Sequence, residues 1–262
     1  MNRRERLNAL VELIAERGEI QIADAVAALG ASPATVRRDL TYLDEQRLAT
    51  RTRGGAIASA ASFDLPLRLK SQRALDEKHR IAQKAASLVG VGSVVALNGG
   101  TTTLEVAHAL AVRPDLSNFA GPGPALTVVT NAVNVAADLL VRPYLKIVVT
   151  GGVVRAHSYE LYGPLTDRSI AELHVNTAIL GVNGYSPSFG ASAFSDAEAS
   201  ANSRLAACAS QVMIVADSSK IGVTAFARIC PPDQVQVLVT DSGVDPGLRA
   251  QIEACGTEVY VV

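Results

Sequence analysis

The sequence predicts an α/β protein in two parts: a small head over residues 1–57 and a larger domain over residues 76–262, joined by a linker over residues 58–75. Three observations support this prediction. Apolar residues recur at helical spacing in the head. Short β-branched runs recur in the larger part, with alanine-rich segments of helical length between most of them. With 48% hydrophobic and 19% charged residues, the 262-residue chain can bury a sizeable core.

The head has the apolar spacing of three short helices. One apolar face covers residues 7–14, and a second covers residues 23–29 and ends at Gly30. A third helix is predicted to begin at Ser32-Pro33, because serine is a preferred N-cap and proline suits the first helical position. Its apolar stripe leaves Thr35, Arg37 and Arg38 facing outward. Two short helices, a tight connection and a polar-faced third helix form a helix-turn-helix pattern.

After the third helix, residues 48–57 predict a small hairpin. Arg51 and Arg53 lie two residues apart and would share one face of a strand. Gly54-Gly55 permits a tight bend or a close approach to another surface. A wing that rests on DNA phosphate or in a minor groove would need these features. The DNA-binding candidates are therefore Ser32, Thr35, Arg37, Arg38, Arg51, Arg53 and Gly54.

Seven apolar runs predict the strands of the larger domain. Because continuous apolar strands alternate with helices, we expect a mostly parallel sheet covered on both faces. A ligand crevice in such a sheet lies beyond the carboxyl ends of the strands. The predicted strands are Val94–Leu97, Leu126–Val129, Lys146–Val149, Ala178–Leu180, Val212–Val215, Val235–Val239 and Val259–Val262.

Polar residues follow these strands, and the segment after the first is the most informative. Residues 98–103, Asn-Gly-Gly-Thr-Thr-Thr, lead from a strand into a helix. Glycines let the backbone approach an anion, and the first amides of a helix point toward it, so phosphate is the expected group. A glycine turn with an ordinary cap is the alternative. Lys220 could neutralise a phosphate or hold a sugar hydroxyl, and the alternative is a solvated loop lysine. Asp196 and Glu198 could bind sugar hydroxyls, and the alternative is a partnership with a helix dipole.

Other patterns exclude several classes of protein. The net charge of −1 gives no support for nucleic-acid binding. The four histidines lack HExxH spacing, and the GxxxxGK[ST], GxGxxG and GxSxG patterns are missing, so we expect no metal, no cofactor and no catalytic residue. There is no apolar run of roughly 18 residues and no signal-peptide pattern. Three scattered cysteines suit a reducing compartment, so we expect a cytoplasmic protein without a membrane partner.

Several segments carry a resemblance to a known family. They are Gly30–Leu40 and Arg51–Ala56 in the head, followed by Gly100–Thr102, Thr130–Asn131, Gly151–Gly152, Gly163 and Asp217–Lys220. On these segments the chain resembles the DeoR family of bacterial transcriptional regulators along essentially its whole length. Departures from the family pattern include Asn98, which stands where aspartate is common, and Arg53, which stands where histidine is common.

The resemblance implies a winged helix-turn-helix that binds double-stranded operator DNA and a sensor domain similar in fold to ribose-5-phosphate isomerase. It also implies a homodimer or homotetramer that represses carbohydrate or nucleoside catabolism genes and is released by a phosphorylated sugar. The effector pocket would comprise Asn98, Gly99, Gly100, Thr101, Thr102, Thr103, Thr130, Asn131, Gly152, Asp196 and Lys220.

The residues alone leave a rival class open. Asp196, Glu198 and Lys220 could in principle support proton transfer, as in a sugar-phosphate isomerase or deaminase with an appended DNA-binding part. No matched acid–base pair is identifiable from their spacing. An activator would use the same residues as a repressor, so the sign of regulation also stays open.

Overall fold

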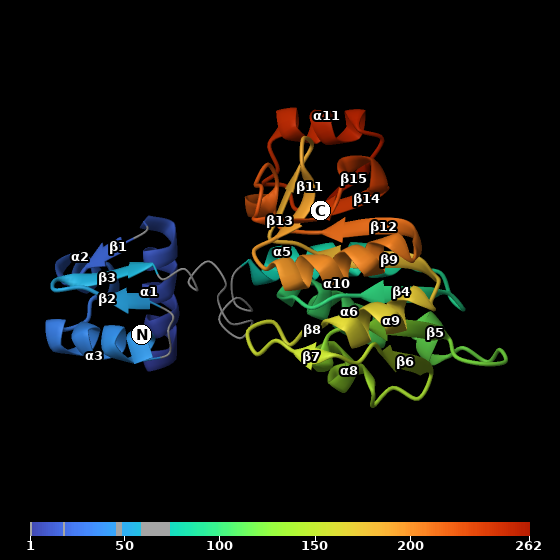
Figure 1. Cartoon of the computed structure of the whole chain (residues 1–262), viewed down its shortest axis with the longest axis horizontal. Helices are drawn as coiled ribbons and strands as arrows, with labels where there is room; N and C mark the ends of the chain where they lie inside the picture. Colours follow the sequence, from blue (N-terminus) through green and yellow to red (C-terminus); the bar gives the residue numbers. More distant parts are fainter. Residues whose placement is uncertain (1, 18, 46–48, 59–73) are drawn as a thin grey trace. The chain divides into compact units, whose positions relative to one another are not determined.

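The structure, a computed structural model, describes residues 2–17, 19–45, 49–58 and 74–262. The chain divides into two compact units, Met1–Lys70 and Ser71–Val262. In Figure 1 the first unit is drawn in blue, and the second runs from teal to red. The predicted linker falls mainly on residues 59–73, which lie outside the described residues.

The head contains the three predicted helices, α1 (Arg3–Arg17), α2 (Ile22–Leu29) and α3 (Pro33–Glu45). Strands β1 (Glu19–Gln21), β2 (Ala49–Arg51) and β3 (Gly55–Ala58) form an antiparallel sheet in the order β1-β3-β2 (Figure 1). The β2–β3 hairpin confirms the predicted wing. Strand β1 was not predicted, because a three-residue strand is too short to show an alternating pattern. The core of the head is formed by Leu10, Ile14, Ile20, Val36, Leu40 and Leu43.

The larger unit is built on a seven-stranded sheet in which all neighbouring strands are parallel, which confirms the predicted fold class. The order of its strands is β15-β14-β12-β9-β4-β5-β6. The strands are β4 (Val94–Leu97), β5 (Leu126–Thr130), β6 (Leu145–Val149), β9 (Val175–Gly181), β12 (Ala209–Val215), β14 (Val237–Thr240) and β15 (Glu258–Val261).

Helices cover both faces of this sheet. Successive strand residues point to opposite sides, so each face of the sheet presents apolar side chains to a layer of helices. Val95 and Leu97 of β4 pack in one apolar cluster, and Ala96 packs in the other. The first cluster includes side chains from α5 (Leu75–Ser87), α6 (Thr101–Ala111), α7 (Pro114–Ser117) and α8 (Val133–Leu139). The second includes side chains from α9 (Pro164–Ala171), α10 (Asp196–Ala207) and α11 (Pro246–Ala254).

Two smaller sheets were not predicted. Strands β10 (Gly184–Ser186), β11 (Gly190–Ala193) and β13 (Ala227–Cys230) form one antiparallel sheet. Strands β7 (Val153–Val154) and β8 (Leu161–Tyr162), of two residues each, form an antiparallel hairpin.

The central sheet reverses its strand order between β4 and β9, so its principal crevice lies beyond the carboxyl ends of these two strands.

Candidate functional site

Helices α2 and α3 form the helix-turn-helix of the head. Gly30 ends α2 in the left-handed region, with φ of 60°, and its N–H bonds to the Val26 carbonyl. Ser32 caps α3: its Oγ accepts the N–H of Thr35 at 3.2 Å and lies 2.8 Å from the Thr35 hydroxyl. Ser32 therefore helps to set the start of α3.

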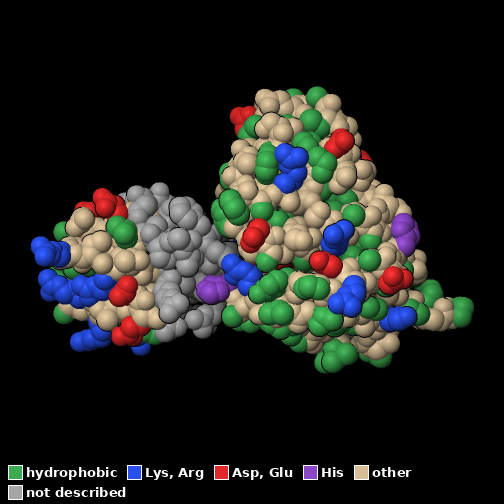
Figure 2. Space-filling view, in the orientation of Figure 1, with side chains coloured by type: hydrophobic (Ala, Val, Ile, Leu, Met, Phe, Trp, Pro, Cys, Tyr) green, Lys and Arg blue, Asp and Glu red, His purple; other side chains and the backbone are tan. Residues whose placement is uncertain are grey.

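Arg37 and Arg38 lie on the exposed face of α3, opposite the buried Val36 and Leu40. Figure 2 shows Lys and Arg side chains gathered on the head. Asp39, which follows Arg38 on the same helix, is 2% exposed, and its carboxylate accepts a hydrogen bond from Arg6 Nε at 2.5 Å. This ion pair fixes α1 to α3, so the outer face of α3 is presented by a well-anchored helix.

The two predicted wing arginines have different surroundings. Arg51 ends β2, and its guanidinium donates to Thr41 Oγ1 at 2.7 Å and to the Arg37 carbonyl at 3.3 Å. Arg53 is exposed in the turn between β2 and β3. Arg51 thus ties the wing to α3, and Arg53 is the wing arginine available to a polyanion.

Gly54 and Gly55 also differ. A Cβ at Gly55 would lie 1.8 Å from the Ile20 carbonyl oxygen, because β3 packs directly on β1 at this point. A Cβ at Gly54 would meet the end of the flexible Gln21 side chain at 2.7 Å. The close approach that the glycine pair suggested is therefore internal to the head and belongs to Gly55.

In the larger unit, Asn98 bridges the two strands at which the order reverses. Its Nδ2 donates to the Gly181 carbonyl at 2.9 Å, and its Oδ1 accepts the Gly181 N–H at 2.8 Å. Asn98 is 2% exposed, so this predicted effector residue uses its amide to hold β4 against β9. An aspartate here would lack the donor for the carbonyl.

The loop after β4 opens α6 with the predicted glycines and threonines. Gly100 is its N-cap, with φ of 134°, and Thr103 Oγ1 donates to the Gly100 carbonyl at 3.2 Å. Thr101 and Thr102 are also buried. The hydroxyl of Thr102 has no hydrogen-bond partner among the residues that the structure describes. A free donor therefore stands in the first turn of a helix, where anions are favoured.

The next two strand ends supply a further free atom. Thr130 Oγ1 donates to the Leu97 carbonyl at 2.7 Å and ties β5 to β4. Asn131 donates to Asn202 Oδ1 at 3.3 Å, whereas its own Oδ1 is buried without a partner in the described part of the chain. Gly152 has φ of 124°, and a Cβ there would lie 2.8 Å from the Tyr162 carbonyl oxygen, so it serves a close backbone approach.

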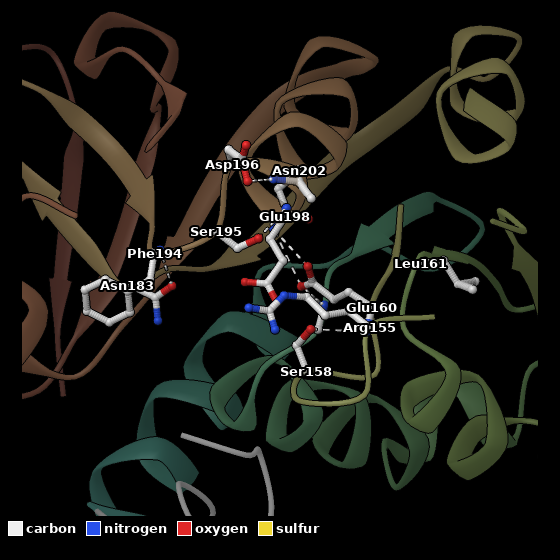
Figure 3. A network of polar contacts seen from close by, with 12 residues as sticks. Arg155, Ser158, Glu160, Leu161, Asn183, Phe194, Ser195, Asp196, Glu198 and Asn202 are labelled. Atoms are coloured by element: carbon white, nitrogen blue, oxygen red, sulfur yellow. Dashed lines mark hydrogen bonds and ion pairs between the residues drawn. The ribbon is translucent and has the colours of Figure 1, made fainter. Parts of the chain in front are cut away.

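Glu160, which was not predicted, lies at the centre of a buried polar network at this edge (Figure 3). The β7–β8 hairpin carries it to the loop after β4, where its Oε1 accepts the N–H of Gly99 at 2.7 Å. Asn202 of α10 donates to both of its oxygens at 3.4–3.5 Å. Glu198 of α10 is 6% exposed, and its Oε1 lies 3.4 Å from Arg155 Nε.

The surroundings of Glu160 favour its neutral form. Burial, and then the neighbouring Glu198 carboxylate, raise the pKa of Glu160 to about 8. Bonds from Gly99 and Asn202 and the charge of Arg155 act in the opposite direction without cancelling the rise. The site therefore contains a carboxyl group that holds its proton at neutral pH.

Lys220 and Asp196 each contact a near neighbour in sequence. Lys220 belongs to η1 (Ser218–Lys220) after β12, and its Nζ is 3.7 Å from Asp217 Oδ2. Burial alone would raise the pKa of Asp217, but Lys220, Ser219 and Lys78 together lower it. β12 is two strands from β4, roughly 10 Å at ordinary strand spacing. Asp196 is exposed and accepts the N–H of Ala197, as a residue in the first turn of a helix does.

One cavity of the larger unit lies away from the predicted effector residues. A cavity of about 480 Å³ opens between α5 and α6, and its lining, which includes His79, Gln83, His108 and Arg113, contains none of the predicted effector residues. No group of three potential metal-binding side chains occurs among the described residues. In the same part of the chain, no helix combines the length and apolarity of a membrane span.

A helix-turn-helix with exposed arginines and a separate α/β unit in one chain define a DNA-binding regulator. The chain matches the DeoR-like helix-turn-helix domain over residues 6–61 and the DeoR C terminal sensor domain over residues 73–242. It therefore belongs to the DeoR family of transcriptional regulators, as the sequence resemblance predicted. Membership makes it a regulator and not an enzyme, which removes the isomerase or deaminase alternative.

The relatives align along nearly the whole chain. The putative aga operon transcriptional repressor of Escherichia coli O157:H7 is 28% identical over 98% of this chain and 93% of its own length. The glycerol-3-phosphate regulon repressor of Escherichia coli strain K12 is 31% identical over 92% of each chain. Ribose 5-phosphate isomerase A from Methanocaldococcus jannaschii is 15% identical and covers 56% of this chain and 54% of its own, with a TM-score of 0.41. A similarity this low says nothing of function.

Proposed function

We propose that the chain is an operator-binding repressor of carbohydrate or nucleoside catabolism genes, and that a phosphorylated sugar releases it from DNA. The buried Thr102 hydroxyl and the buried side-chain oxygen Oδ1 of Asn131, which have no partner among the described residues, carry this proposal. Buried polar atoms in folded proteins nearly always have hydrogen-bond partners, so these free atoms, with Thr240 Oγ1 at the end of β14 as a third among the described residues, point to a ligand at this sheet edge. The repressors of the aga operon and the glycerol-3-phosphate regulon are relatives whose names agree with a sugar-related role.

The chemistry of the edge suits a phosphosugar. The first amides of α6 and the Thr102 hydroxyl would bind phosphate, and Asn131 Oδ1 would accept a sugar hydroxyl. Lys220 and Asp196 stay predicted contacts on the strength of their position alone. The direct test is a thermal-shift screen of phosphosugars, followed by release of a labelled promoter fragment by those that bind. If no phosphosugar both binds and releases DNA, the proposal fails.

Replacing Thr102 with valine should remove effector binding without harming the fold. Valine has nearly the same shape, and losing an unpartnered buried hydroxyl should leave the effector-free protein as stable or more stable by about 1 kcal/mol. Thr103→Val is the matched control, because it breaks an existing bond to Gly100 and should cost about 1 kcal/mol. Thermal unfolding and effector titration measure both effects. Unchanged effector affinity in Thr102→Val would contradict the assignment.

On the DNA side, we propose that Arg37, Arg38 and Arg53 bind chiefly phosphate, and that Thr35 and one of the two arginines of α3 reach base edges. A homodimer or homotetramer would present paired α3 helices to successive major grooves. Effector binding acts only if it favours one arrangement of the paired heads over another.

Replacing Arg37 with alanine should weaken operator binding by about 1–3 kcal/mol, roughly 5- to 150-fold, because an exposed cation is lost from α3, the helix proposed to enter the major groove. Effector affinity should not change. Arg249→Ala is the matched control, since Arg249 is also an exposed arginine and lies on α11 of the other unit. Fluorescence anisotropy with a promoter fragment measures the loss; equal affinity of the Arg37 variant and wild type would refute the role.

A further inference from the structure

Glu160 places a carboxyl group at the turn where the proposed phosphate site lies. Its Oε1 accepts the Gly99 N–H at 2.7 Å, and the residue is 3% exposed. A Cβ on Gly99 would lie 2.4 Å from Glu160 Cγ, so the acidic side chain packs directly on the backbone of this turn. An anion that approaches the start of α6 must therefore accommodate the charge of Glu160.

Two carboxyl groups, Glu160 and Glu198, meet in this network. Glu198 comes from α10, Arg155 from the β7–β8 connection, and the neutral donors are Asn202 and Gly99. Burial and the Glu198 carboxylate raise the pKa of Glu160 to about 8, and the donors and Arg155 do not cancel this rise.

We propose that Glu160 is a specificity-determining residue of the effector site: its neutral form admits an anionic ligand at the start of α6, and its ionised form excludes one. In the neutral form, the side-chain oxygen Oε1 of Glu160 can keep the bond from the Gly99 N–H. The other oxygen of the carboxyl group, now protonated, can donate to a phosphate oxygen. In the ionised form, two anions would share a site from which water is excluded, where repulsion is strong. Dianionic phosphate esters are thus bound together with the proton on Glu160.

This inference rests on the proposed function and deepens it. The test titrates the full-length chain with ribose 5-phosphate at intervals from about pH 7 to 9.5, where this monoester stays dianionic. Inorganic phosphate, which loses its second proton at a higher pH than the ester does, is titrated from about pH 8 to 9.5. Wild-type affinity should fall by about tenfold per pH unit once Glu160 ionises in the free protein. Glu160→Gln, whose amide never ionises, should bind both probes with nearly constant affinity.

A second measurement counts the proton directly. Isothermal titration calorimetry at about pH 9, in two buffers of different ionisation enthalpy, should show uptake of close to one proton by wild type and none by Glu160→Gln. Glu253→Gln, an exposed substitution on α11, is the matched control and should behave as wild type. The wild-type count needs no variant, so it decides the matter even if Glu160→Gln folds poorly.

The outcomes separate the two proposals. If a probe binds wild type with no alkaline loss of affinity and no proton uptake, the role of Glu160 is wrong and the phosphosugar site stands. The role of Glu160 is equally wrong if Glu160→Gln shows the alkaline loss of wild type. If neither probe nor any member of the phosphosugar screen binds at any pH, the proposed function fails and the role of Glu160 fails with it.

Discussion

Replacing Gly55 with alanine will abolish operator binding, whereas the same change at Gly54 will leave the affinity within about twofold of wild type. At Gly55 the new Cβ would lie 1.8 Å from the Ile20 carbonyl oxygen and 2.9 Å from Gln21 Cα, both backbone atoms. Strands β1 and β3 would have to separate, at a cost of about 3 kcal/mol or more. A domain as small as the head rarely has more than about 3–5 kcal/mol of stability.

The matched change at Gly54 meets the end of a flexible side chain, Gln21 Oε1 at 2.7 Å, which can move aside. Anisotropy with a promoter fragment gives the operator affinity of both variants. Calorimetry should show that Gly55→Ala loses the unfolding transition of the head and keeps that of the residue 71–262 unit. Operator binding by Gly55→Ala at wild-type affinity would show that the β1–β3 contact does not hold the head in its DNA-binding form.

The glycine pair shows how far the sequence alone could go in the head. Two glycines after two arginines predict a turn and a close approach, and the predicted hairpin is present. The sequence could not tell which glycine is indispensable, because the surface it approaches belongs to β1. A strand of three residues with one buried side chain leaves no usable pattern.

The large sheet was predictable for a different reason. Parallel strands buried on both faces must be continuously apolar, and each of the seven β-branched runs corresponds to one strand of the sheet. The strands of the small hairpin β7–β8 and of the antiparallel sheet β10-β11-β13 are two to four residues long and of mixed composition. Their pairing partners come together only in the folded chain, which local patterns do not record.

The sequence predicts where on the sheet the candidate site lies, but it predicts only some of the residues that form the site. Thr102 and Asn131 lie where strand ends place them, whereas Asn98 proves to bridge strands. Glu160 reaches Gly99 from 61 residues away along the chain, and Asn202 reaches Glu160 from 42 residues further on. No spacing rule connects such residues, because the hairpin and α10 bring them together only in the folded chain.

The second large effect concerns stability without any ligand. Between about pH 5 and 8, wild type should lose stability relative to Glu160→Gln. Burial and Glu198 raise the pKa of Glu160 from 4.5 in an unfolded chain to about 8 in the folded one. Across this window the unfolded state releases the proton while the folded state keeps it, so rising pH favours unfolding. Below the window both states are protonated, and above it both are ionised, so the difference levels off.

The expected slope approaches 1.4 kcal/mol per pH unit for one proton, which amounts to a few kcal/mol across the window. Urea unfolding of wild type and Glu160→Gln at intervals from pH 5 to 9 measures it, with Glu253→Gln as the control that should parallel wild type. The two proteins are compared by the slope of their unfolding free energy against pH. Glutamine turns one acceptor toward Asn202 into a donor at every pH, which shifts the free energy of unfolding by the same amount throughout. Glu198→Gln removes the second cause of the raised pKa, so it should move the loss of stability to a narrower, more acidic window. Parallel curves for wild type and Glu160→Gln would mean that Glu160 is already ionised in the folded protein at neutral pH, with its charge balanced by Arg155 and its other neighbours.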